Sequence, residues 1–372
     1  MVGLVFLACS RSDVVNLGIA AATGDIYAVQ RLATRKAVNY AVNPKALVRD
    51  LKRLSDAIKR VWGQDEIKIP EPKRYVKYSQ NYLSRALVDF DKGRIVVETL
   101  DSSKPQERLQ NAIITTLLTP YDPRAVDLFS DSKIALGATP FLFNEVLDHD
   151  QKPIRWEWRA KRFADHLIKT DLKKRVLSGK GAKKTVHYVV FDMVADHLRI
   201  RARKYSGLVE RYAGRYGISP NLVFAIIKTE SDFNPYAVSK APAYGLMQIV
   251  PSTAGQDVRK FLNQQGVPSP NFLFNAENNI QYGTVYLHLL MDRYLKNVSD
   301  PVSKEYCVIA AYNTGAGNVL KTFDGNRQRA VERINNLKPL QVYKKLVNEL
   351  GYAEARRYLG KVVTAKKDFV KM

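Results

Sequence analysis

The sequence predicts an α+β protein, with a mixed N-terminal domain followed by an all-helical one. Residues 82–100 hold two runs rich in β-branched and apolar side chains around Asp91-Lys92-Gly93, which is typical of a β-hairpin. After Asp196, apolar residues recur at helical spacing in segment after segment. We therefore expect three parts: a leader or tether over 1–25, an α+β domain over 26–196, and an all-helical domain over 197–372.

The elements of the N-terminal domain follow from local patterns. Asn43-Pro44 can start a helix, because Asn caps well and proline suits the first helical position. Prolines mark 67–72 as a linker, and the hairpin strands are 82–90 and 94–100. Further along, we expect helices at 106–118 and 162–175, a short helix or turn at 120–130, a hairpin at 146–158 and a strand at 185–193.

This half shows no catalytic constellation. Its histidines are scattered, and Asp148-His149-Asp150 is more typical of a solvated turn than of a metal site. Trp156 and Trp158 would share one face of the second hairpin. Core packing is the favoured interpretation of the pair, with sugar stacking as the alternative.

Helices account for the second half. The expected segments are 197–216, stopped by Gly217, then the helix carrying Glu230, 279–294, 303–312, 329–334, 339–350 and 353–361. Val223, Ile226, Ile227 and Glu230 share one stripe of their helix, so Glu230 extends an apolar face towards the helix end at Asn234-Pro235. Burial and the negative helix end would both raise the pKa of this carboxyl, as a general acid requires.

Several separated motifs accompany Glu230. Glu230-Ser231 is followed by Ser239, by Gly245-Leu246-Met247-Gln248 and by Ala311-Tyr312-Asn313. In this order they resemble the catalytic domain of the lytic murein transglycosylases, which has a goose-type-lysozyme-like fold. Residues 78–85 and 116–128 are similar to the N-terminal domain of a membrane-bound branch of that family.

The resemblance implies a reaction that uses one carboxyl group and neither cofactor nor metal. Glu230 would protonate the oxygen between N-acetylmuramic acid and N-acetylglucosamine and then deprotonate the C6 hydroxyl, leaving a 1,6-anhydromuramic end. The resemblance also assigns substrate contacts to Ser239, Met247, Gln248, Tyr312, Asn313 and Tyr358. Met247 could equally fill the core. The sequence departs from the family at Ala241-Pro242-Ala243-Tyr244, where Tyr244 could narrow a subsite.

Two other functions remain open at this point. A lysozyme-like hydrolase of the same fold would need a second carboxylate beside the cleft. A non-enzymatic protein that binds cell wall or nucleic acid would use the basic charge.

The formal net charge is +23. Residues 199–372 hold 26 basic and 13 acidic residues, so the charge is spread over both halves. Such a spread fits a polyanionic partner. No nucleic-acid-binding motif and no basic stripe on one helix is present, so we expect no nucleic acid as a partner. The resemblance implies peptidoglycan glycan strands as the partner, and we expect a monomer.

The two cysteines differ in context. Cys307 lies in an apolar run and is expected to be buried. Cys9 closes the apolar stretch Met1–Cys9, which looks like the end of a bacterial lipoprotein signal. We therefore expect lipidation at Cys9 and an outer-membrane lipoprotein that faces the periplasm. The alternative is an incidental cysteine in a disordered N-terminus.

Overall fold

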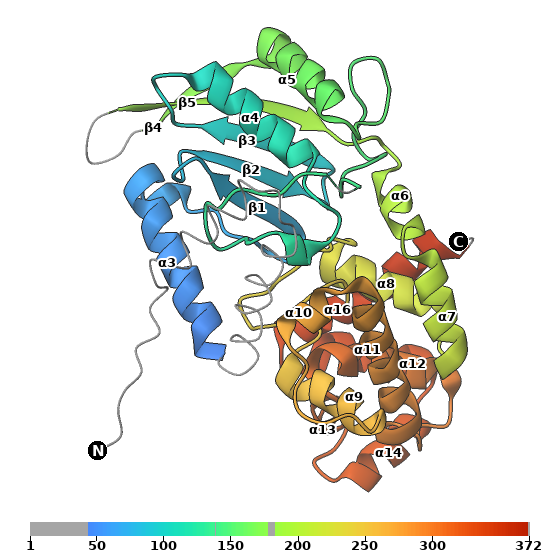
Figure 1. The fold of residues 1–372 in the computed structure, drawn as a ribbon. Coiled ribbons are helices and arrows are strands. Elements are labelled where there is room, and N and C mark those ends of the chain that lie inside the picture. The colour runs from blue at the N-terminus through green and yellow to red at the C-terminus, as the bar shows by residue number, and fades with distance from the viewer. Residues whose placement is uncertain (1–43, 138, 178–182, 371–372) are drawn as a thin grey trace, which may run out of the picture. The chain divides into compact units, whose positions relative to one another are not determined.

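A computed structural model describes residues 44–137, 139–177 and 183–370, and the chain divides into two compact units (Figure 1). The first unit takes in the chain up to Ile200 with two later segments, Pro235–Pro242 and Ser269–Asn275. The remaining residues from Arg201 onwards form the second unit. Within the described residues, no helix combines the length and the apolar character needed to cross a membrane.

The first unit is built on a five-stranded antiparallel sheet. The predicted hairpin is present, with a Gly93 turn in the left-handed region (φ 63°). A Cβ atom at Gly93 would lie 2.7 Å from Nε2 of His197, so this position also lacks room for a side chain. The strand order is β1-β2-β3-β5-β4, with β1 Arg74–Ser79, β2 Ser84–Asp89, β3 Arg94–Thr99, β4 Lys173–Leu177 and β5 Lys184–Asp192.

Helices cover both faces of this sheet (Figure 1). On one face, α4 (Pro105–Leu117) and α5 (Glu157–Asp171) pack on alternate strand residues, among them Val88, Ile95 and Val189. On the other face, α3 (Pro44–Trp62) buries Leu54, Ile58 and Trp62 against Val76 and Val186. Because successive side chains of a strand point to opposite faces of the sheet, the same strands contribute to two hydrophobic cores, one on each face.

The later segment Pro235–Pro242 is anchored in the first of these cores. Tyr236 is buried there, with its ring centroid 5.1 Å from that of Tyr75 and 5.4 Å from that of Phe141. Its hydroxyl donates a hydrogen bond to the carbonyl of Pro120. This anchor explains why the segment belongs to the first unit.

The prediction of a hairpin at 146–158 is wrong. Only a single antiparallel bridge, Leu147 to Pro153, forms there, and α5 begins at Glu157. Trp156 and Trp158 therefore stand at the start of a helix and are 59% and 57% exposed, so the core interpretation of the pair is also wrong. Their local sequence, Trp-Glu-Trp-Arg-Ala-Lys-Arg, continues into a helix whose buried face begins only at Ala160.

The second unit is helical, which together with the mixed sheet unit confirms the α+β class. The expected helix 197–216 is two helices that meet at Lys204-Tyr205, and Gly217 ends the second with φ 64°. Short helices that the patterns did not predict are α9, α13 and, in the first unit, α10. The bounds are α6 His197–Arg203, α7 Ser206–Tyr216, α8 Pro220–Ser231, α9 Gln256–Phe261, α10 Pro270–Phe274, α11 Ala276–Leu289, α12 Pro301–Thr314, α13 Ala316–Lys321, α14 Arg327–Asn335, α15 Pro339–Glu349 and α16 Ala353–Ala365.

Candidate active site

Glu230 lies in the last turn of α8, the helix buried along residues 222–227. The helix ends at Ser231, three residues earlier than the Asn234-Pro235 boundary predicts. Asp232 and Phe233 adopt left-handed backbone angles (φ 49° and 59°), which stop the helix before the proline. Glu230 is half-buried there.

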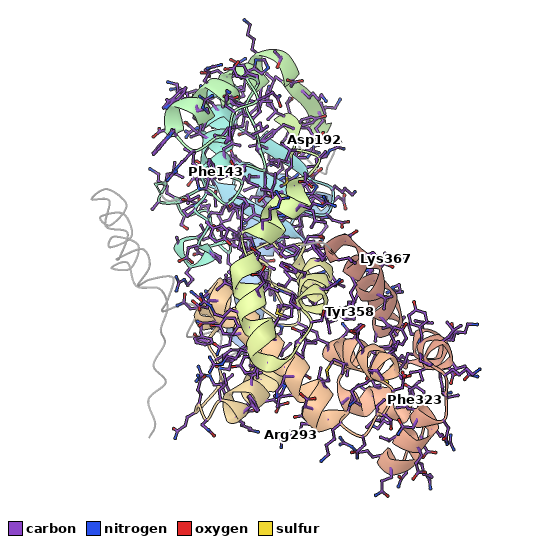
Figure 2. All side chains as sticks on the ribbon, turned by 90° about the vertical axis from the view of Figure 1, so that its right-hand side faces the viewer. Phe143, Asp192, Arg293, Phe323, Tyr358 and Lys367 are labelled. Carbon is purple, nitrogen blue, oxygen red and sulfur yellow. The ribbon has the colours of Figure 1, made fainter. Side chains whose placement is uncertain are left out.

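Tyr358 holds the carboxyl group of Glu230. It comes from α16, which packs against α8, and its hydroxyl donates a 2.7 Å hydrogen bond to Oε1 of Glu230. Figure 2 shows Tyr358 among the helices of the second unit. Burial raises the pKa of Tyr358 well above its usual value, and the charge of Glu230 adds to this shift. The phenol is therefore a neutral donor at neutral pH.

Tyr312, in the last turn of α12, is a second phenol near the acid. Burial raises its pKa well above the usual value, with further contributions from Glu230 and Tyr286. Its hydroxyl donates a 2.8 Å hydrogen bond to the carbonyl of Met247. Tyr312 thus links the surroundings of Glu230 to the loop that carries Met247.

That loop, residues 244–249, is a tight turn closed by paired backbone hydrogen bonds between Tyr244 and Ile249. Asn279 of α11 holds its two sides. The Asn279 amide donates to the carbonyl of Tyr244 (2.8 Å), and its oxygen accepts from the backbone N–H of Met247 (2.7 Å). The hydroxyl of Ser231, next to Glu230, donates to the carbonyl of Leu246 (2.7 Å). The end of α8 and the loop are therefore joined directly.

Met247 itself is fully buried, so its side chain lies in the core beneath the loop rather than at the surface where a sugar could contact it. Met247 packs against Gly283 of α11. A Cβ atom at position 283 would lie 2.2 Å from the sulfur of Met247 and 2.9 Å from the Cβ atom of Met247. Only glycine leaves room for the methionine at this position.

Gln248 offers an unused polar atom. Its backbone is left-handed (φ 48°), and its Nε2 donates to the carbonyl of Gly245 (2.8 Å). Its Oε1 is buried and has no hydrogen-bond partner among the described residues. A buried acceptor left unmatched costs free energy unless a ligand or water satisfies it. This unmatched acceptor makes Gln248 a candidate for a contact with a bound molecule.

The other predicted site residues lie as follows. Asn313 is exposed beside Tyr312, and Tyr244 is buried, so its ring is not at the surface. Ser239 belongs to the segment 235–242 of the first unit, where its hydroxyl donates to the carbonyl of Ala241. Cys9 lies outside the described residues.

Sequence reasoning missed three residues that shape the site: Ser231 as a tie between helix and loop, Asn279 and Gly283. The sequence offered no local signal for Asn279, because it follows Asn278 in the polar first turns of α11 and only its burial marks an amide that needs partners. Among the described residues, no group of three or more His, Cys, Asp or Glu side chains could hold a metal ion. The arrangement can hold one carboxyl group beside neutral donors and exchange its proton with a bound molecule.

Comparisons with known proteins give two family matches and similar solved structures. A model of the N-terminal domain of membrane-bound lytic murein transglycosylase C matches residues 40–204, and a model of the transglycosylase SLT domain matches residues 207–335. Among solved structures, the 70 kDa soluble lytic transglycosylase of Escherichia coli is 27% identical over 47% of this chain and 26% of its own, with a TM-score of 0.36.

Two bacterial relatives match this chain over most of their own length. The membrane-bound lytic murein transglycosylase C of Cronobacter sakazakii is 46% identical over 83% of this chain and 85% of its own. The protein of the same name from Serratia proteamaculans is 43% identical over 89% and 93%. This chain therefore belongs to the family of membrane-bound lytic murein transglycosylase C.

Proposed function

We propose that Glu230 is the single carboxyl group with which this peptidoglycan lytic transglycosylase moves protons. The observation that carries the proposal is the 2.7 Å hydrogen bond from Tyr358 to Oε1 of Glu230 in the last turn of a buried helix. The phenol of Tyr358 is neutral, so this hydrogen bond positions the carboxyl group without itself adding a positive charge. Family membership supports the reaction class.

The Tyr358 hydrogen bond also sets which oxygen carries the acid proton. Because Oε1 accepts from the phenol, a protonated Glu230 carries its own proton on Oε2. That proton goes to the glycosidic oxygen between N-acetylmuramic acid and N-acetylglucosamine as the bond from C1 to this oxygen breaks. The 2-acetamido oxygen assists at C1.

In the second half of the reaction, Glu230 acts as the base. The C6 hydroxyl of the muramic acid attacks C1, and its proton returns to Oε2 of Glu230. A 1,6-anhydro bond forms, no water is consumed, and the carboxyl group is restored. One carboxyl group therefore suffices, whereas hydrolysis of such bonds usually needs a pair.

The loop 244–249 supplies substrate contacts in this proposal. The unpartnered Oε1 of Gln248 accepts a hydrogen bond from a sugar hydroxyl or amide. Asn313 and Tyr312 contact the bound sugar, and the family resemblance alone is the basis for giving Ser239 the contact to the acetamido group. Met247 contributes from below, by supporting the loop through its packing on Gly283.

Glu230→Gln tests the reaction. Removing a general acid–base costs roughly 100- to 10,000-fold in rate, so the variant should release almost no muropeptide from purified sacculi while it keeps its fold by circular dichroism. Mass spectrometry of the wild-type products should show anhydromuropeptides, each lighter than the hydrolysed form by one water. Mainly reducing ends would instead favour the lysozyme-like hydrolase.

We further propose that Cys9 is lipidated and holds the enzyme on the periplasmic face of the outer membrane, as a monomer without nucleic-acid partners. The apolar leader that ends in Leu7-Ala8-Cys9 supports this, and the relatives are named membrane-bound. A palmitate analogue should label the protein in cells, and Cys9→Ser should release it to the soluble fraction. An unlabelled protein that stays in the membrane would contradict the proposal.

A further inference from the structure

The start of α5 presents an unusual surface of the first unit. Trp156 and Trp158 are both more than half exposed, although tryptophan usually buries most of its large apolar area. Their Cα atoms are at most about 7 Å apart, since two residues of chain span no more than that. We use the name indole patch for Phe143, Arg155, Trp156, Trp158 and Arg159, which ring–guanidinium contacts join in two groups that are adjacent in sequence. Figure 2 marks Phe143, at its edge.

Each indole ring rests on a guanidinium group. Arg159 lies 4.5 Å from the ring centroid of Trp158, and Arg155 lies 5.1 Å from that of Trp156 and 5.9 Å from that of Phe143. Such cation–π contacts favour one placement of the ring over others. Each tryptophan thus has a favourable contact while more than half of its surface remains open to solvent.

The base of the patch is rigid. Arg159 is ion-paired with Asp148, whose side chain is buried, and Asp148 also accepts from the backbone N–H groups of Asp150 and Lys152. Burial opposes ionisation of Asp148, but the hydrogen bonds from Lys152 and Arg159 outweigh it and lower its pKa. The ion pair that seats Trp158 thus persists at neutral pH.

The charge around the patch is mixed rather than strongly positive. Residues 148–162 hold five basic side chains, but Arg159 and Arg162 are already paired with Asp148 and Asp150. Glu157 is exposed between the two tryptophans. Anionic lipid surfaces are recognised by clusters of four to eight unopposed cations, which this patch does not provide. A flat sugar with hydroxyl groups suits it better.

We propose that the indole patch binds a murein glycan strand outside the catalytic site. The C–H face of a pyranose ring stacks on an indole ring, Glu157 accepts from sugar hydroxyls, and Arg155 with Lys152 pairs the carboxylates of the peptide stems. No ion pair of the described residues occupies Arg155 or Lys152, so both are available. The proposal rests on this chain acting on murein, and it assigns the first unit a role in holding that substrate.

The chain offers a direct probe, because it contains three tryptophans and the third, Trp62, is only 3% exposed in the core. In a full-length Glu230→Gln background, which prevents digestion, soluble murein glycan strands should shift the tryptophan emission. Trp156→Ala/Trp158→Ala should abolish this shift and weaken co-sedimentation with sacculi by at least about tenfold, the loss typical of a Trp anchor. Trp156→Tyr/Trp158→Tyr, which keeps flat rings, should restore most of the co-sedimentation.

A matched control separates sugar stacking from general loss of apolar surface. Leu340→Ala/Tyr352→Ala removes two side chains that are each 61% exposed in the second unit, and it should leave sacculus binding unchanged. With Glu230 intact, Trp156→Ala/Trp158→Ala should cleave a short soluble glycan at the wild-type rate, so a failed patch and a failed catalytic assignment are distinguishable. An emission shift with anionic lipid vesicles but not with glycan would overturn the proposal, as would unchanged sacculus binding in the double alanine variant.

Discussion

Each unit contains a glutamate whose carboxyl group is held by other side chains, but the partners differ in charge. In the first unit, Arg85 and Arg175 both pair with Glu66 and Glu98, and the Arg85 side chain is only 1% exposed. In the second unit, Glu230 accepts from the neutral hydroxyl of Tyr358. The same side-chain type is thus fixed by guanidinium groups in one place and by a phenol in the other.

The difference distinguishes a carboxylate held in ion pairs from the carboxyl group that we propose as the acid and base of the reaction. Burial would raise the pKa of Glu66, but hydrogen bonds from Arg175 and Arg85 outweigh it and lower the pKa to about 2. Such a group stays ionised and cannot donate a proton at neutral pH. In the proposed mechanism, the neutral phenol of Tyr358 positions Glu230, and the carboxyl group gives and takes a proton. Four variants or conditions test this contrast.

Arg85→Met should have the largest effect on stability. The substitution removes one guanidinium partner of the buried Glu98. Because removing one partner of a buried ion pair leaves a charge uncompensated, the free energy of unfolding should fall by about 3–5 kcal/mol. Urea unfolding measures this loss. Arg94→Met is the matched control, because the Arg94–Asp192 pair is exposed on the same sheet and its removal should leave the urea midpoint unchanged. A shift of equal size in both variants would contradict the structural role of the buried cluster.

Tyr358→Phe should damage cleavage rather than folding. It removes one hydrogen bond to a charged group, worth about 1.5–3 kcal/mol, so kcat should fall about 10- to 100-fold. The same change at Tyr343, a half-buried tyrosine of α15 that packs on Tyr306, should leave kcat unchanged. A wild-type kcat for Tyr358→Phe would show that the phenol does not orient Glu230.

Gly283→Ala tests whether the active-site loop depends on packing. A Cβ atom there would collide with Met247, and overpacking of this kind costs about 1–3 kcal/mol. Both thermal stability and cleavage should fall, because the methionine carries the loop with it. Gly214→Ala on α7 is the control, since its Cβ would meet nothing within 4 Å. That variant should be at least as stable as the wild type.

Local patterns predicted the elements well where one rule dominated. The Gly93 hairpin, the strand ending at Asp192 and the helix bearing Glu230 all follow from alternation, helical spacing or a turn residue. The patterns failed at 146–158, where aromatic and basic residues were consistent with strand or helix. Tertiary packing selects the helix in this segment, since the buried face of α5 begins at Ala160.

The site shows the same limit. Glu230 and Tyr358 were named from sequence motifs, and the structure brings them into contact across 128 residues. The residues that hold the loop 244–249 could not be predicted from local sequence, because Asn279 lies 32 residues from Met247 and 35 from Tyr244. Only the folded chain brings these residues together. Exposure of Trp156 and Trp158 was likewise unpredictable, because residue type favours burial.

The last and smallest effect is the acid sensitivity of the Glu66 cluster. Its folded pKa of about 2 lies below the ordinary 4.5, so its contribution to stability is complete above pH 4.5 and is lost as pH falls from there towards 2. Urea midpoints measured at pH 6, 5, 4 and 3 should therefore decline below pH 5. In Glu66→Gln the decline should be shallower, since the neutral amide binds no proton in either state. Parallel declines for the wild type and Glu66→Gln would contradict this prediction. They would mean that other carboxyl groups set the loss of stability in acid, and that ionisation of Glu66 contributes nothing to it.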